Sequence, residues 1–209
     1  VQAFQFLDCD VNKLGVDLMT LSAHKIYGPK GMGLLYVKNK SINQLTNQLI
    51  NSIITGGGQE FGLRSGTENV PAIVGFAKAV ELAVKNREKE NKRIFELTNY
   101  FWKELKKVNP NVQLNNDLNQ KQFDYLPNIL NIYFPNQNSQ DLLIKLDLAD
   151  IAVSSGSACS TRLTQPSHVL KAIGLNEKRI KSSLRFSLGK FTAKEEINKT
   201  IKIMKKGLR

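Results

Sequence analysis

The feature that most constrains this chain is a long amphipathic stretch between Pro71 and Pro110. Apolar residues recur at helical spacing in both of its halves, and residues 85–93 between them are charged. Proline suits the first turn of a helix but cannot continue its interior, so the two prolines mark the ends. The pattern predicts one long helix, or two with a bend, of the kind that connects two domains.

Short apolar runs typical of strands lie on both sides of this stretch, at residues 16–22, 34–37, 129–134, 151–153 and 183–188. Helix N-caps are expected at Ser139 and Ser167, and a capping box at Thr192–Glu195. Alternating strands and helices predict an α/β fold with a smaller α+β domain at the C-terminal end. We expect the domain boundary inside the long helix, which gives domains 1–87 and 88–209.

Charge and cysteine content narrow the functional class. Among 209 residues, 30 Lys and Arg against 18 Asp and Glu give a net charge of +12, which permits a nucleic-acid partner. The basic residues are mostly lysines scattered along helices, without the interleaved aromatics of a base-stacking surface, so a nucleic-acid-binding module is the weaker alternative. Two cysteines exclude a disulfide-rich scaffold, and no apolar run approaches the roughly 20 residues of a membrane span. We expect a cytoplasmic protein with no membrane partner and no metal.

The first candidate site lies at the end of a predicted strand, in residues 22–31. Ser22 and His24 can donate to a phosphate, and the Lys25 amine can form a Schiff base with an aldehyde cofactor. Loops after strands are where open α/β sheets bind ligands. The alternative is an exposed lysine beside a turn.

Two further loops are rich in small residues. Residues 56–67 contain three consecutive glycines followed by Arg64 and Thr67, which can contact an anion; the alternative is a flexible loop. Residues 154–161 place Cys159 among small residues, mostly serines, where a thiolate could travel to a substrate; the alternative is an inert buried thiol. Cys9 is expected to be inert, because the neighbouring Asp8 and Asp10 carboxylates oppose thiolate formation.

Arg185 lies inside a predicted apolar strand, residues 183–188. A guanidinium there needs an anionic partner, and a carboxylate fits it bidentately. The partner is either a ligand or an internal carboxylate.

Taken together, these motifs resemble the group I cysteine desulfurases, the NifS/IscS-like pyridoxal-phosphate enzymes of the class-V aminotransferase superfamily. The resemblance rests on Ser-x-His-Lys-x-Tyr-Gly-Pro-Lys-Gly, Gly-Gly-Gly-Gln-Glu-x-Gly-x-Arg-Ser-Gly-Thr, Ser-Ser-Gly-Ser-Ala-Cys and Arg-Phe-Ser-Leu-Gly. It implies fold type I, the aspartate aminotransferase-like fold, with the C-terminal part of the large domain followed by the small domain. The chain begins at Val1 without Met, and we expect it to be the C-terminal piece of a longer protein.

The resemblance also implies roles for individual residues. Lys25 would be the Schiff-base lysine and Cys159 the sulfur-accepting nucleophile. Arg185 would bind the substrate carboxylate. The remaining cofactor contacts would come from Gln2, Ser22, His24 and Thr67, with Thr67 reaching the phosphate in the other subunit of a homodimer.

The expected activity is release of sulfur from L-cysteine, which yields L-alanine and a Cys159 persulfide. The persulfide would pass to an iron–sulfur scaffold or another acceptor, such as a tRNA-thiolation protein. Three alternatives stay open: an aminotransferase of the same fold type, a selenocysteine lyase, and an inactive truncated remnant.

Overall fold

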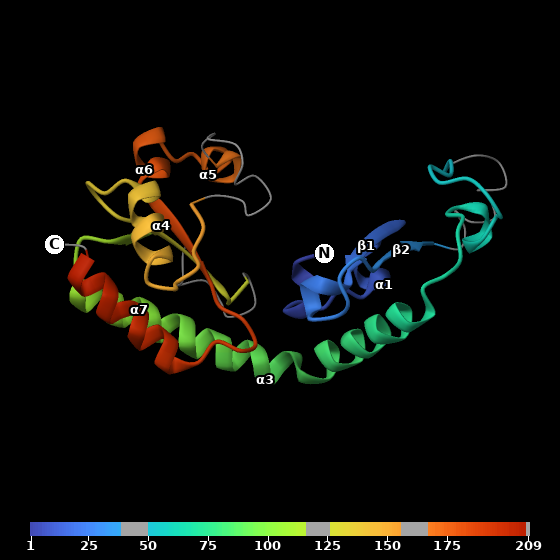
Figure 1. Cartoon of the computed structure of the whole chain (residues 1–209), viewed down its shortest axis with the longest axis horizontal. Helices are drawn as coiled ribbons and strands as arrows, with labels where there is room; N and C mark the ends of the chain where they lie inside the picture. The colour runs from blue at the N-terminus through green and yellow to red at the C-terminus, as the bar shows by residue number, and fades with distance from the viewer. Residues whose placement is uncertain (39–49, 116–125, 156–166, 208–209) are drawn as a thin grey trace. The chain divides into compact units, whose positions relative to one another are not determined.

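The computed structural model describes residues 1–38, 50–115, 126–155 and 167–207. These residues divide into two compact units, Val1–Glu88 and Lys89–Arg209 (Figure 1). Helices and strands are mixed in both units, in agreement with the α/β prediction. Within the described residues, no helix is long and apolar enough to cross a membrane.

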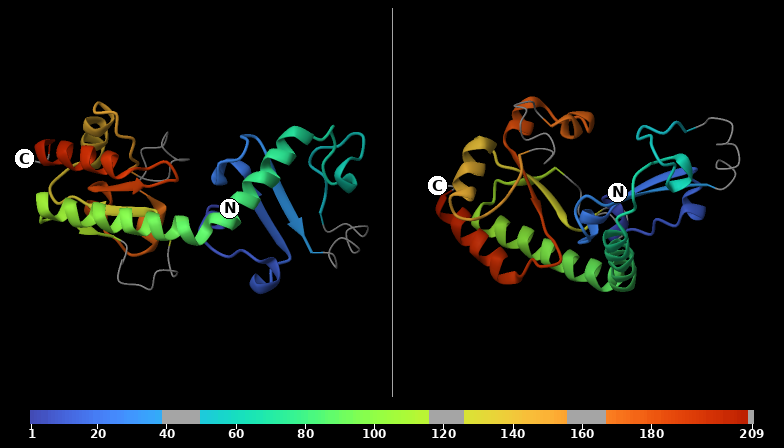
Figure 2. Two further views of the ribbon diagram at one scale, coloured as in Figure 1. Left: turned by 90° about the horizontal axis from the view of Figure 1, so that it is seen from below. Right: turned by 45° about the vertical axis from the view of Figure 1, so that its right-hand side comes forward.

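The first unit is built around a two-stranded antiparallel sheet, β1 (Leu18–Ser22) and β2 (Gly33–Val37), visible as two adjacent arrows in Figure 2. The described part of this unit also contains three short 3-10 helices, the single turn α1 and the start of α3. Its small core joins Ala23 and Ile26 to Phe76 and Ala79 of α3. The remaining short elements are η1 (Ala3–Gln5), α1 (Val11–Leu14), η2 (Ala23–Ile26) and η3 (Glu60–Gly62).

The predicted long helix is one continuous helix, α3 (Val70–Val108). It begins one residue before Pro71, which accordingly occupies its first turn. In the second unit its apolar residues Ile94, Phe101 and Leu105 are almost fully buried.

The second unit contains an antiparallel sheet in the order β3-β4-β5. Its strands are β3 (Gln113–Leu114), β4 (Ile129–Tyr133) and β5 (Ser183–Ser187). Leu130 and Ile132 of β4 pair with Phe186 and Leu184 of β5, and this face packs into one core with α3, α4 and α7. Figure 1 shows α7 beside the C-terminal part of α3. The helices of this unit are α4 (Ser139–Asp147), α5 (His168–Ala172), α6 (Glu177–Lys181) and α7 (Lys194–Gly207).

Three local predictions are corrected. Residues 151–153 are not a strand: Ile151 and Val153 pack against the core, and only the next residue, Ser154, forms an isolated bridge with Arg185. Ser139 is the first residue of α4 and not its cap, because the Asn138 side chain accepts from the Gln140 amide.

The predicted capping box at Thr192–Glu195 is also wrong. Thr192 Oγ1 accepts from the Gly189 amide, so this hydroxyl closes the turn before the helix. Glu196, one residue later than predicted, accepts from the Ala193 amide. The Ser167 cap is confirmed, since its hydroxyl accepts from the Leu170 amide.

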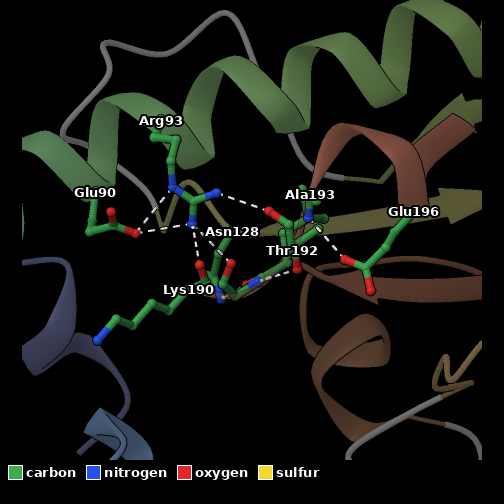
Figure 3. A network of polar contacts seen from close by, with 9 residues as sticks. Glu90, Arg93, Asn128, Lys190, Thr192, Ala193 and Glu196 are labelled. Atoms are coloured by element: carbon green, nitrogen blue, oxygen red, sulfur yellow. Dashed lines mark hydrogen bonds and ion pairs between the residues drawn. The ribbon is translucent and has the colours of Figure 1, made fainter.

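The turn between β5 and α7 is attached to α3 by Arg93 (Figure 3). The Arg93 guanidinium donates to the carbonyls of Gly189, Lys190 and Thr192 at 3.2, 2.9 and 2.9 Å. Glu90, one turn earlier on α3, accepts from the same guanidinium at 3.0 Å. Charge-assisted hydrogen bonds of this kind are stronger than neutral ones. Helix α3 therefore contacts β5 in two ways, by packing on its apolar face and by binding the turn at its end.

The packing of β5 against α3 predicts a large difference between two leucine substitutions. Leu184 is completely buried, so Leu184→Ala should lower the free energy of unfolding of the intact protein by about 2–5 kcal/mol. Leu148 is 83% exposed, and Leu148→Ala should change it by less than about 0.5 kcal/mol. Urea unfolding of both variants measures the difference, and equal losses would contradict this description of the core.

Candidate functional site

The Lys25 turn is formed by burial of its apolar positions. β1 ends at Ser22, and η2 follows with Ala23 and Ile26 buried in the core of the first unit. His24 and Lys25, between them, are therefore exposed. Ser22 Oγ and His24 Nδ1 share a hydrogen bond of 2.9 Å. The turn thus presents a hydroxyl and an imidazole joined by a hydrogen bond, followed in the chain by an exposed amine.

Two glycines allow this turn to lie close to α3. A Cβ on Gly28 would meet the Cβ atoms of Ala23 and Ala79, both at 3.1 Å. A Cβ on Gly75 of α3 would lie 2.8 Å from the Pro29 ring, which is closer than real contacts allow. The helix and the Lys25 turn therefore leave no room for a side chain at either glycine.

The segment that follows Gln2 packs beside this turn. It precedes η1, whose Phe4 packs against the core containing Ala23 and Ile26. Arg87 of α3 holds the segment: it donates to the Phe4 carbonyl at 3.3 Å, and its guanidinium lies 5.5 Å from the Phe4 ring centroid. The structure thus brings the Gln2 segment to the Lys25 turn through packing.

Thr67 lies at the end of a loop whose residues form hydrogen bonds with one another. The Gly58 amide donates to Ser65 Oγ at 3.2 Å, and the Gly66 amide donates to Gln59 Oε1 at 2.9 Å. Gly66 has φ +114°, a conformation that favours glycine. Thr67 itself is exposed, and no contact joins it to Ser22, His24 or Lys25 among the described residues.

Arg185 lies on β5, on the face opposite the core. Its neighbours Leu184 and Phe186 are buried against the helices, so Arg185 alternates to the other side. Its backbone bonds to Ser154, with the Arg185 amide donating at 2.6 Å. Among the residues that the structure describes, Arg185 has no ion pair, and its buried Nε has no hydrogen-bond partner. The internal carboxylate considered above is thus not found there, and the chemistry of this donor fits an external anion.

The polar face around Arg185 was not predicted. Asn131 is the register partner of Arg185 on β4, and Asn115 Nδ2 donates to Asn131 Oδ1 at 2.7 Å. Arg179 of α6 donates to Asn115 Oδ1 at 2.6 Å. The available signal was the alternation in residues 129–133, which places Ile129, Asn131 and Tyr133 away from the core.

The predicted nucleophile, Cys159, lies outside the described residues. Cys9 is a free cysteine with intermediate exposure. It lies near Asp8, whose pKa is held below its ordinary value by a hydrogen bond from Lys13. The predicted site residues that the structure describes therefore fall into two groups, Gln2 to Thr67 in the first unit and Arg185 in the second.

Comparison with known proteins gives concordant matches along the whole chain. Residues 1–200 match the family "Aminotransferase class-V". A curated relative, "Cysteine desulfurase IscS" of Dictyoglomus turgidum, is 41% identical over 206 residues, which cover 99% of this chain and 50% of the relative. The chain thus spans about half the length of the curated relatives that it matches.

Solved structures agree with these sequence matches. A "NIFS-LIKE PROTEIN" superposes with a TM-score of 0.83 at 33% identity, covering 100% of this chain and 50% of that one. A NifS-like protein from Rickettsia africae superposes with a TM-score of 0.81 at 37% identity, covering 99% and 51%. These likenesses confirm the predicted fold type.

The close approach of α3 to the Lys25 turn predicts the sign of a glycine substitution. At an open helical position, Gly→Ala gains roughly 1 kcal/mol of stability. Gly75→Ala should instead destabilise the intact protein by about 1–3 kcal/mol, because the new methyl group overlaps Pro29. Thermal unfolding measures the change, and a raised Tm would show that the turn and the helix are not packed this closely.

Proposed function

Because the chain belongs to the class-V aminotransferase family, we propose that it carries one part of the active site of a cysteine desulfurase. The proposed reaction takes sulfur from L-cysteine and yields L-alanine and a persulfide on Cys159. Its main support is the match of nearly the whole chain to curated cysteine desulfurases. The matches do not favour the aminotransferase, selenocysteine lyase or remnant alternatives.

The residues of the first unit fit pyridoxal 5′-phosphate. Lys25 would hold its aldehyde carbon, Ser22 and His24 its phosphate, and Gln2 its phenolic oxygen. Support comes from the exposure of Lys25 next to the Ser22–His24 hydrogen bond. When bound, the cofactor supplies an electron sink that makes the Cβ–Sγ bond of the substrate labile.

Arg185 would bind the substrate carboxylate. Its Nε is buried and has no hydrogen-bond partner within the described residues, and a bidentate carboxylate would satisfy it. The free Lys25 amine would move protons at the substrate Cα. The Cys159 thiolate would attack the substrate sulfur; the sulfur–carbon electron pair then passes to Cβ, which takes up a proton to complete alanine.

The proposal extends to partners. Thr67 is exposed, and we assign it to the cofactor phosphate of the other subunit in a homodimer. The Cys159 persulfide would pass to an iron–sulfur scaffold or another sulfur acceptor. We place these steps in the cytoplasm, without direct contact to nucleic acid or membrane.

The two cysteines of the chain provide a matched test in the intact protein. Cys159→Ser should abolish persulfide formation with L-cysteine, because a hydroxyl cannot accept the sulfur, and should keep the visible absorbance of the bound cofactor. Cys9→Ser should leave both unchanged, since Cys9 lies among carboxylates. Persulfide labelling with mass spectrometry, together with the absorption spectrum, measures the outcome. Sulfur transfer that survives Cys159→Ser would overturn the assignment of the nucleophile.

A further inference from the structure

A polar network crosses the face of the sheet on which Arg185 lies. It begins at Arg179 on α6, whose Nε donates to Asn115 Oδ1 at 2.6 Å. Asn115 Nδ2 in turn donates to Asn131 Oδ1 at 2.7 Å and to Ser183 Oγ at 2.8 Å. The side-chain oxygen of Asn115 and both of its N–H groups are therefore engaged, and Asn115 is the centre of the network.

The network holds two neighbours of Arg185 on this face. Asn131 is directly opposite Arg185 on β4, and Ser183 precedes it by two residues on β5. The Arg185 amide and carbonyl both bond to Ser154, so Arg185 and Asn131 form a non-hydrogen-bonded antiparallel pair. Side chains lie closest together in such pairs. The orientation of the Asn131 amide therefore bears directly on the space available to the Arg185 side chain.

Arg179 anchors the other end of the network firmly. Its Nη1 donates to Gln113 Oε1 and its Nη2 to the Leu114 carbonyl, both at 3.0 Å. Its guanidinium also lies 4.9 Å from the ring centroid of Tyr133, the neighbour of Asn131 on the same face. With all three nitrogens engaged, Arg179 fixes Asn115 and is not itself positioned to take a ligand.

We propose that Asn115 is a positioning residue for Arg185 and sets the affinity of the enzyme for the substrate carboxylate. This role rests on the proposed cysteine desulfurase function. By accepting from Asn115, the Asn131 oxygen is turned toward Asn115, and a carboxylate-binding arginine needs neighbours held within a fraction of an ångström. Asn115 acts through Asn131 and Ser183 and does not touch the substrate.

The decisive variant is Asn115→Asp in the intact holoenzyme. Aspartate has the same shape and still accepts from Arg179, now as an ion pair, so the fold is retained. It cannot donate to Asn131 or Ser183, so both hydrogen bonds from the Asn115 side chain are lost, including the one that turns the Asn131 oxygen toward Asn115. We expect kcat/KM for L-cysteine to fall about tenfold, mainly through KM, with an unchanged Tm.

A readout independent of turnover is the affinity for L-alanine, a carboxylate ligand without a thiol, measured by calorimetry. Its Kd should rise about tenfold in Asn115→Asp. Cysteamine, which lacks a carboxylate, should bind equally to both proteins. In an Arg185→Lys background, Asn115→Asp should have less than about a threefold further effect, since coupled residues are not additive.

Asn198→Asp is the matched control. Asn198 lies on α7, away from the sheet, and also accepts a hydrogen bond, from Tyr100 Oη of α3 at 2.6 Å. It should leave KM and the affinity for L-alanine unchanged. Asn115→Ala controls for any effect of the negative charge that Asn115→Asp introduces. It should raise KM as Asn115→Asp does.

The outcomes separate this role from the function on which it rests. A wild-type holoenzyme that releases no alanine from L-cysteine overturns the proposed function, and the role of Asn115 with it. An active wild-type enzyme whose Asn115→Asp variant keeps its KM and its affinity for L-alanine overturns only the role of Asn115. The role of Asn115 alone is also overturned if Asn198→Asp weakens L-alanine binding equally. The same conclusion follows if Asn115→Asp keeps its full effect on that affinity in the Arg185→Lys background.

Discussion

The second unit depends on the burial of one face of the β4–β5 pair. Leu130, Ile132 and Leu184 are fully buried there and pack with α3, α4 and α7 into a single core. Because side chains alternate along a strand, burying this face places every second residue on the other. Arg185 and Asn131 owe their shared polar surface to the apolar residues beside them, and a one-residue slip of β5 would exchange the two faces.

The same principle presents Lys25 in the first unit, although its turn is a 3-10 helix. Ala23 and Ile26 are three residues apart and lie on one side of that helix, where they are buried against α3. His24 and Lys25 are then exposed between them. Both groups of proposed site residues are therefore presented by buried apolar residues that do no chemistry.

Periodic features of the chain were predictable, and features decided by competing contacts were not. The apolar stripe between Pro71 and Pro110 was sufficient for α3, because a pattern of that length has few other interpretations. Residues 151–153 carry a short apolar run that packing explains without strand pairing. At α4, Asn138 and Ser139 are both good caps, and only the backbone conformation decides between them.

Most of the candidate site could be predicted from local motifs, since Ser22, His24 and Lys25 are close in the chain. The network around Arg185 could not, because Asn115, Asn131 and Arg179 are distant in sequence and meet only through sheet register and the placement of α6. The short α6 itself was missed, as five residues carry too little periodicity to indicate a helix. Its Asn176 cap, which accepts from the Arg179 amide, was a local sign of it.

Because of the contact between Arg93 and the β5–α7 turn, substitutions in the turn and substitutions at position 93 should be tolerated differently. Arg93 recognises carbonyl oxygens, which every amino acid possesses, and not the side chains that the turn carries. This contact therefore places no demand on the identity of residues 190 and 191, whereas no other side chain supplies the same rigid fork of donors at position 93. The turn can diverge between related proteins to suit different neighbours, while the means of holding it in place stays the same.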